Sequence, residues 1–253
     1  MKKTLLFLFS VLINVVSVFG QESIQTDRPD QTESSYLVPA GTLQFESGMN
    51  YERPGNGSEV LVHPTLLWRL GLNDRFELRL ISDLTTQKIN DASSFGLDPL
   101  AVGFKANLLE ERGWIPRTSF IAHLTLPWAA TENRIVDNHY PDFRFTFLNN
   151  VSEKVALGYN VGAQWDGISA SPTFLYTFAP CFVLGEKLGC YIEAFGYFPE
   201  DRKADHRIDA GFTYLVNSDA QLDLSAGKTL TETSSEAYYV SLGFSWRWKL
   251  TRQ

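Results

Sequence analysis

The chain has 253 residues, of which 44% are hydrophobic, the composition of an ordinary globular protein with one large or two average domains. Acidic residues outnumber Lys and Arg by 29 to 22, and this excess argues against nucleic acid as a partner. Beyond residue 20 no apolar run approaches the roughly 18 residues of a membrane-spanning helix, so any crossing of a membrane must use strands.

The first twenty residues have the pattern of a secretory signal. Lys2 and Lys3 precede the apolar run LLFLFSVLINVVSVFG, which ends in Val18-Phe19-Gly20 with small residues at the positions that a signal peptidase reads. We predict that residues 1–20 are a cleaved signal peptide and that the mature chain begins at Gln21. A membrane anchor is the alternative, but the run is short for one, and the polar sequence QESIQTDRPDQTESS follows at once.

From residue 42 onward, apolar and polar residues alternate in segments of about ten. In the closing stretch EAYYVSLGFSWRWKL, for example, Leu242 falls on the apolar face of an extended strand and Ser241 on the polar face. Two segments, 173–183 and 189–198, are apolar on both faces, and the pattern does not orient them. We count twelve segments: 43–51, 60–69, 75–80, 100–108, 119–126, 142–147, 157–165, 173–183, 189–198, 207–214, 221–225 and 236–250.

The connections between these segments alternate in length. GLND, NNVSEK, LGEK and VNSDA are tight turns and EERGWIP is a looser one, whereas TTQKINDASSFGLD and PWAATENRIVDNHYPD are long and polar. Short turns at one end, long loops at the other and an even number of strands are typical of an outer-membrane barrel with both termini in the periplasm.

A soluble β-sandwich also has strands of period two and is the alternative. The polar face here is rich in Gly, Asn and Ser, and aromatic residues such as Trp68, Trp165 and Trp246 lie near strand ends, where a bilayer interface favours them. We therefore predict an all-β fold, a transmembrane antiparallel up-and-down β-barrel of about 12 strands over residues 42–250. A periplasmic leader or plug, residues 21–41, precedes it.

Three stretches carry a resemblance to a known family. TDRPDQTESSYLVPAGTLQFE, LNDRFELRL and FGLDPLAVGFKANL, in this order and spacing, resemble the outer-membrane transporter family named after the MetA pathway of phenol degradation. The strand ending HLTLPW is similar to the strand that follows in that family. The resemblance covers roughly the first half of the mature chain and implies a channel for small solutes, with aromatic or hydrophobic compounds as candidates.

The inward face of the predicted barrel carries charges of both signs. Such charges either pair across strands and brace the wall or form a constriction that selects solutes by size and charge. A barrel of twelve strands is expected to have a narrow or partly plugged passage. The pore-lining candidates are Glu46, Arg69, Arg75, Glu77, Arg79, Lys105, Arg144, Asp209, Asp223 and Arg247, and the same face carries Asp142 and Arg207.

The leader itself is a second candidate for the lumen. Asp27, Arg28 and Asp30, around Pro29, are expected either to fold into the periplasmic mouth and pair with lumen charges or to belong to a disordered tail.

Cys181 and Cys190 flank the LGEK turn. If that turn is centred on Gly185-Glu186, the two cysteines face each other as a closely spaced pair, which allows a cross-strand disulfide in the oxidising periplasm. The alternative is two small apolar residues of the wall.

We expect no enzyme, cofactor or metal. No Ser lies in a nucleophile-elbow context, and Asp137 with His139 supplies too few ligands for a metal. The expected partners are outer-membrane lipid and lipopolysaccharide, a small-molecule solute and the barrel-assembly machinery. A structural or adhesive barrel is the main alternative to a channel, and an outer-membrane hydrolase is a weaker one.

Overall fold

The computed structural model describes residues 23–250, apart from residues 56, 91 and 232–236. The predicted signal peptide and the cleavage site at Gln21 lie outside the described residues. Among those described, no helix is long and apolar enough to span a membrane.

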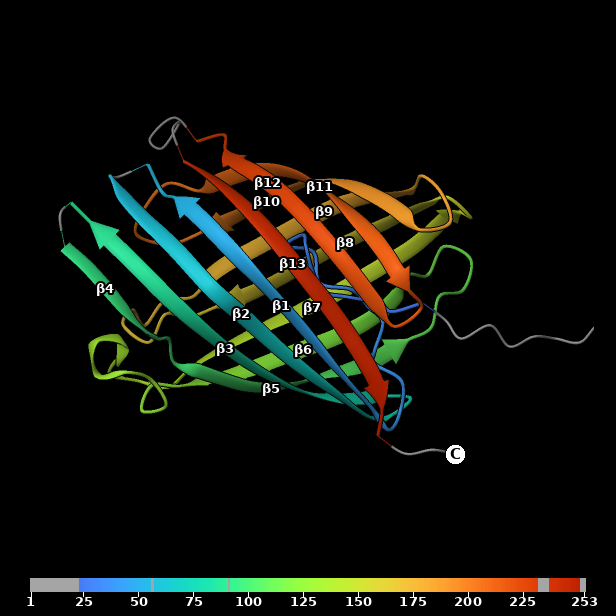
Figure 1. The fold of residues 1–253 in the computed structure, drawn as a ribbon, viewed down its shortest axis with the longest axis horizontal. Coiled ribbons are helices and arrows are strands. Elements are labelled where there is room, and N and C mark those ends of the chain that lie inside the picture. Colours follow the sequence, from blue (N-terminus) through green and yellow to red (C-terminus); the bar gives the residue numbers. More distant parts are fainter. Residues whose placement is uncertain (1–22, 56, 91, 232–236, 251–253) are drawn as a thin grey trace, which may run out of the picture.

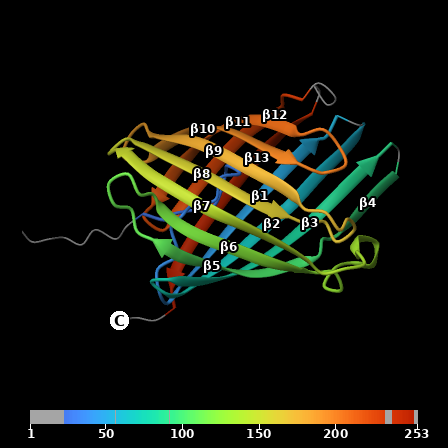
Figure 2. The same cartoon turned by 180° about the vertical axis from the view of Figure 1, so that it is seen from behind.

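Thirteen strands form one antiparallel sheet that closes on itself (Figures 1 and 2). Except for β4 and β5, each strand pairs with its neighbours in the chain, and β1 pairs with both β2 and β13 to close the wall. β4 and β5 both pair with β3, one beyond the other, so thirteen segments occupy twelve places in the barrel. The predicted fold class is confirmed. The strands are β1 Thr42–Arg53, β2 Ser58–Asn73, β3 Phe76–Ile89, β4 Ala92–Leu97, β5 Leu100–Leu109, β6 Arg117–Leu126, β7 Tyr140–Ser152, β8 Val155–Gln164, β9 Thr173–Val183, β10 Leu188–Phe198, β11 Asp205–Asn217, β12 Ala220–Thr229 and β13 Tyr238–Lys249; a short 3-10 helix, η1, spans Glu132–Arg134.

One connection that looked like a loop is a hairpin. The stretch TTQKINDASSFGLD continues β3 to Ile89 and returns as β4, with Leu84 opposite Leu97. Asp98-Pro99 then separates β4 from β5, since proline has no N–H for the strand ladder. The hairpin extends the wall beyond the rest of the barrel (Figure 1). The expectation of a long polar loop here was therefore wrong, because its β-branched and small residues pair across the strands.

The two faces of the wall follow the alternation in the sequence. On β13 Leu242 is 58% exposed on the outside, whereas Ser241 is 5% exposed on the inside. Large apolar side chains on the outer face of every side of the barrel are exposed in the same way, among them Leu78, Phe104, Leu124, Phe145, Phe178, Phe212 and Leu224. An apolar belt of this extent is far larger than a water-facing surface normally carries, so the belt faces lipid.

The structure orients the two strands that the pattern left open. On β10 Glu193 is 1% exposed inside the barrel and Ile192 is 59% exposed outside. Its partner β9 turns Thr177 and Cys181 inward, because antiparallel partners share a face and Cys181 lies opposite Tyr191.

The cross-strand disulfide, one of the two alternatives that the sequence left open, is not formed in this structure. Gly189 pairs with Val183 across the β9–β10 turn, which shifts the register by one residue from a turn centred on Gly185-Glu186. Cys190 therefore lies opposite Phe182 and not opposite Cys181. A shift of one residue places the two cysteines on opposite faces of the wall, and both are free thiols.

Candidate functional site in the barrel lumen

Residues 23–41, the leader segment, run inside the barrel before β1 begins. The turn end of the barrel is the end that carries the β2–β3, β5–β6, β7–β8, β9–β10 and β11–β12 turns, and the loop end is the opposite one. The backbone N–H of Ile24 donates to Ser218 O at the turn end (2.8 Å), and that of Val38 donates to Glu77 on β3 (2.7 Å). The leader segment thus bonds to the wall near both of its ends.

Asp27 of the leader segment is held by three cations of the wall. Its carboxylate oxygens lie 2.6 Å from Arg79 on β3, 2.9 Å from Lys105 on β5 and 3.2 Å from Arg69 on β2. All four side chains are buried. Burial alone would raise the pKa of Asp27, but the charges of Arg69, Lys105 and Arg79 outweigh it and hold the pKa well below its ordinary value.

Two wall carboxylates complete this basic cluster of Arg69, Arg79 and Lys105. Glu46 and Glu77 each lie 2.8 Å from Arg69, and Glu77 also lies 3.1 Å from Arg79. Both acids are completely buried. Without Asp27, three buried cations of the wall would face only two buried carboxylates. The leader segment supplies the third negative charge that balances them.

Arg28 reaches the opposite side of the lumen. Its guanidinium lies 3.1 Å from Asp223 on β12 and donates to Ser241 Oγ on β13 (2.8 Å). It fits over Gly48 and Gly243, where a Cβ would overlap the guanidinium. Glycine is needed at both positions because any side chain there would occupy the space of the Arg28 guanidinium.

The middle of the leader segment binds β10. The N–H of Gln31 donates to Glu193 Oε2 (2.8 Å), and Thr32 Oγ1 lies 2.6 Å from both Glu193 Oε1 and Thr177 Oγ1. Asp209 on β11 lies opposite Glu193 and accepts a hydrogen bond from Tyr239. Asp30, which directly precedes Gln31, lines the cavities on both sides of the leader segment.

Arg144 on β7 contacts the leader segment from a third direction. It donates to Gln31 O (3.0 Å) and lies 3.8 Å from Glu33, whose other oxygen binds Arg79 at 2.8 Å. Arg79 also donates to His123 Nε2 (2.9 Å), which fixes the ring. Leader residues are therefore bonded to almost every side of the wall.

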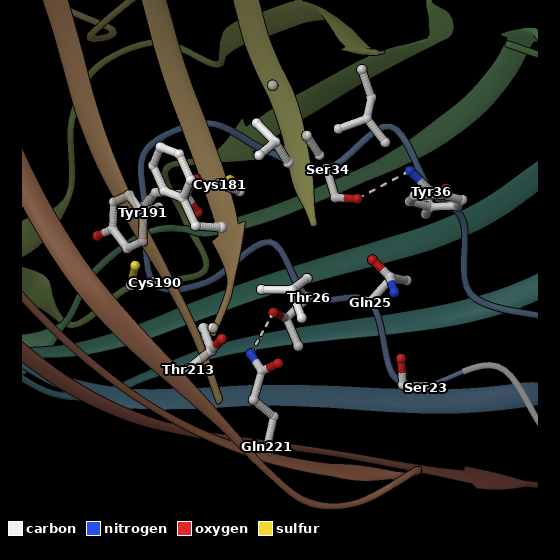
Figure 3. A pocket seen from close by; sticks show the side chains of 18 of the residues that line it. Ser23, Gln25, Thr26, Ser34, Tyr36, Cys181, Cys190, Tyr191, Thr213 and Gln221 are labelled. Atoms are coloured by element: carbon white, nitrogen blue, oxygen red, sulfur yellow. Dashed lines mark hydrogen bonds between the residues drawn. The ribbon is translucent and has the colours of Figure 1, made fainter. Parts of the chain in front are cut away.

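Cavities lie on both sides of the leader segment. The turn-end cavity has a volume of about 500 Å³, and Thr26 of the leader segment bonds there to Gln221 of β12 at 2.8 Å (Figure 3). The loop-end cavity has about 450 Å³. Arg28, Pro29, Asp30 and Glu33 line both cavities, so the leader segment lies between them.

A third cavity of about 900 Å³ opens among the loops of the loop end. It shares Tyr197 and Arg207 with the loop-end cavity, so the two spaces meet there. Arg207 is held by Glu52 and Asp205, each 2.8 Å away. The turn-end cavity thus lies on one side of the leader segment, and the loop-end cavity and the third cavity lie on the other.

Nine of the ten pore-lining candidates lie on the inward face: Glu46, Arg69, Glu77, Arg79, Lys105, Arg144, Asp209, Asp223 and Arg247. Arg247 lies near the turn end and binds Asp219 at 2.9 Å. Arg75 does not line the lumen, because β3 begins only at Phe76 and Arg75 is exposed in the turn before it. Asp27, Arg28 and Asp30 all lie inside the barrel.

Sequence reasoning missed several residues of this site. Glu193 was overlooked because its strand is apolar on both faces, and Thr32 because nothing local marks a contact to β9. Inward glycines were the available signal, since a Cβ on Gly71 would overlap the carbonyl oxygens of Val38 and Pro39. Small inward residues in a narrow barrel leave room for another segment.

Comparison with known proteins supports this assignment of the fold. The family model described as "Putative MetA-pathway of phenol degradation" matches residues 26–248. The chain belongs to this family. The resemblance seen in three stretches is therefore confirmed, and the match extends beyond the first half of the mature chain to the last strand. No curated protein matches the chain.

Solved structures with the same fold are outer-membrane proteins. The COG4313 outer membrane channel from Pseudomonas putida F1 is similar with a TM-score of 0.66 and 15% identity, over 87% of this chain and 99% of that one. The KdgM porin in complex with disordered oligogalacturonate (TM-score 0.54, 9% identity) covers 81% and 98% of the two chains. The NanC porin (TM-score 0.54, 7% identity) covers 80% and 98%. At these identities the likeness shows the fold.

Proposed function

We propose that this protein is an outer-membrane channel for the passive passage of small solutes and that the leader segment closes its lumen at rest. The observation that carries the proposal is the position of Arg28, Pro29, Asp30 and Glu33, which line the cavities on both sides. A solute that crosses the barrel has to pass these residues.

The membrane and its orientation follow from the outer surface and the connections. The apolar belt fits a bilayer, and short turns belong to the periplasmic side of such barrels. We therefore assign the turn end to the periplasm and the loop end to the cell exterior. Lipopolysaccharide then surrounds the loop end, and insertion requires the barrel-assembly machinery.

The lining of the loop-end cavity favours amphiphilic or aromatic solutes. Val62, Leu67 and Ile81 supply aliphatic surface there, and Phe195 and Tyr197 supply aromatic surface. Arg144 lines the same cavity, and its Nε has no hydrogen-bond partner among the described residues. A planar apolar solute with one acidic or hydroxyl group matches this combination.

Solute flux into liposomes tests the channel directly. Purified wild-type protein should admit small solutes such as benzoate faster than protein-free liposomes do, and removal of residues 23–39 should increase the rate. Heat-modifiable gel mobility would show that both barrels are folded. If neither protein raises the flux above that of empty liposomes, a structural or adhesive barrel becomes the better account.

A further inference from the structure

Three carboxylates meet in the lumen without a cation beside them. Glu193 and Asp209 face each other on β10 and β11, and Asp30 of the leader segment directly precedes Gln31, whose N–H binds Glu193. Among the described residues none of the three forms an ion pair, although Asp27, Glu33 and Asp223 all do. We call Asp30, Glu193 and Asp209 the acidic cluster.

The two wall carboxylates of this cluster are buried and only partly hydrogen-bonded, whereas Asp30 is half-buried. Glu193 is 1% exposed and takes two hydrogen bonds from the leader segment, at Gln31 and Thr32. Asp209 is 5% exposed and accepts from Tyr239, but its Oδ1 has no partner within the described structure. Like charges at close range repel strongly where little water screens them.

The surroundings supply no compensating charge. Arg28 is bound by Asp223, Arg144 contacts Gln31 O and Glu33, and the basic cluster is bound by Asp27. The described residues contain no group of side chains arranged to hold a metal ion. On the wall, Cys181 of β9 and Tyr191 of β10 line the turn-end cavity together with Asp30, and Tyr239 of β13 lines the loop-end cavity with it. The cations that line the loop-end cavity from the wall are Arg79, Arg144 and Arg207, and each of them lies beside another acid, Glu33 or Glu52.

We propose that the acidic cluster makes closure of the lumen depend on pH. When the cluster loses its protons, repulsion between its carboxylates displaces the leader segment from its bound position in the lumen, its seat, and opens the passage. The proposal rests on the proposed function, because displacement of the leader segment matters only if that segment closes the lumen. The leader segment is thus held by Asp27 and opposed by Asp30, three residues away.

The direction of the pH effect follows from linkage. Burial, and then the charges of Glu193 and Asp209, raise the pKa of Asp30 well above its ordinary value while the segment is seated. The seated state therefore binds more protons than the released state, and its stability falls as the pH rises from about 4, the ordinary pKa of Asp. Asp27 has a lowered pKa and is ionised in both states above that pH, so it adds no pH dependence there.

Flux of a small neutral sugar into liposomes, measured from about pH 5 to about pH 9, tests the proposal. Wild-type flux should rise with pH, by up to about tenfold per pH unit for each proton released. Asp30→Asn should give low flux across the whole range, because the leader segment then carries no carboxylate there for Glu193 and Asp209 to repel and keeps its hydrogen bonds to Glu193. Asp209→Asn, which removes a wall carboxylate and leaves the leader segment unaltered, should also flatten the profile. A flat wild-type profile, or variants that follow the wild type, would overturn the proposal.

A reversible lock separates this proposal from the proposed function. Thr32 Oγ1 and Thr177 Oγ1 lie 2.6 Å apart, so Thr32→Cys with Thr177→Cys places two thiols at disulfide distance, in a background of Cys181→Ser and Cys190→Ser. If oxidation lowers the flux but wild-type flux ignores pH, only the acidic-cluster proposal fails. If oxidation and reduction give equal flux at every pH, closure by the leader segment fails as well.

Discussion

Gly48 on β1 lies directly opposite Gly243 on β13, and the guanidinium of Arg28 occupies the space that the two missing side chains leave. A wall strand that carried any larger residue at either place would push Arg28 away from Asp223 and Ser241. The position of the leader segment in the lumen therefore depends on the size of the residues at these two places in the wall.

Gly48→Ala should therefore loosen the leader segment without unfolding the barrel. The three atoms nearest to the added Cβ all belong to the guanidinium of Arg28, so this side chain, and not the strand, has to move. We expect solute flux to rise several-fold, as for the loss of about 1 kcal/mol of hydrogen bonding. Gly185→Ala is the matched control, because nothing lies within 4 Å of its Cβ. Equal flux in the two variants would count against the fit described here.

Asp27→Asn should release the leader segment more strongly. The change leaves Arg69, Arg79 and Lys105 with too little negative charge in a buried site, and breaking one buried ion pair typically costs about 3–5 kcal/mol. Hydrogen exchange of residues 23–39, read by mass spectrometry, should become much faster. Glu153→Gln changes an exposed acid in the β7–β8 turn and should leave exchange unaltered. Protected exchange in Asp27→Asn would show that the basic cluster does not hold the segment.

Arg144→Gln should alter charge selectivity. Arg144 lines the loop-end cavity, so its positive charge is placed to attract an anion where little water screens the charge. Uptake of benzoate should fall relative to benzamide, after subtraction of the leak of empty liposomes. Arg75→Gln removes the same charge from an exposed turn and should leave the ratio unchanged. A ratio that responds equally to both variants would mean that bulk charge, and not the lumen, sets selectivity.

Leu242→Arg should impair assembly of the barrel. Leu242 lies on the lipid-facing side of β13, where a charge near the middle of the bilayer costs about 2–4 kcal/mol. Glu186→Arg introduces the same side chain into the β9–β10 turn and should be tolerated. The heat-modifiable gel mobility of the two variants in membrane extracts measures how much of each protein has assembled. Normal assembly of Leu242→Arg would contradict the conclusion that this face of β13 contacts lipid.

The alternating residues of β1 and β13 were enough to predict the barrel and which face of these strands points inward, because a period of two is a local property. For the residues before β1 the sequence left two alternatives open, a plug in the periplasmic mouth and a disordered tail, and local patterns could not decide between them. Their arrangement in the lumen depends on pairs such as Asp27 with Lys105 and Arg28 with Asp223, which are far apart in sequence. The inward glycines at positions 48, 71 and 243 are an indirect sign of this arrangement, because they leave space for the leader segment.

Two errors have equally physical causes. The turn between β9 and β10 is one residue out of the assumed register, and a single residue exchanges the faces on which Cys181 and Cys190 lie. The stretch from Thr85 to Asp98 is polar, yet it forms a hairpin, since strands beyond a bilayer need no apolar face. Polarity alone therefore does not distinguish a loop from an extended wall.

Closure of the lumen by the leader segment is tested most directly by the current through single barrels that carry the cysteine pair at positions 32 and 177. The current is recorded in a planar bilayer through cycles of oxidation and reduction. We expect oxidation to abolish most openings and reduction to restore them, and we expect a variant with only the cysteine at position 32 not to respond. Equal currents in the oxidised and reduced states would contradict this closure, because solutes would then pass a leader segment that cannot move.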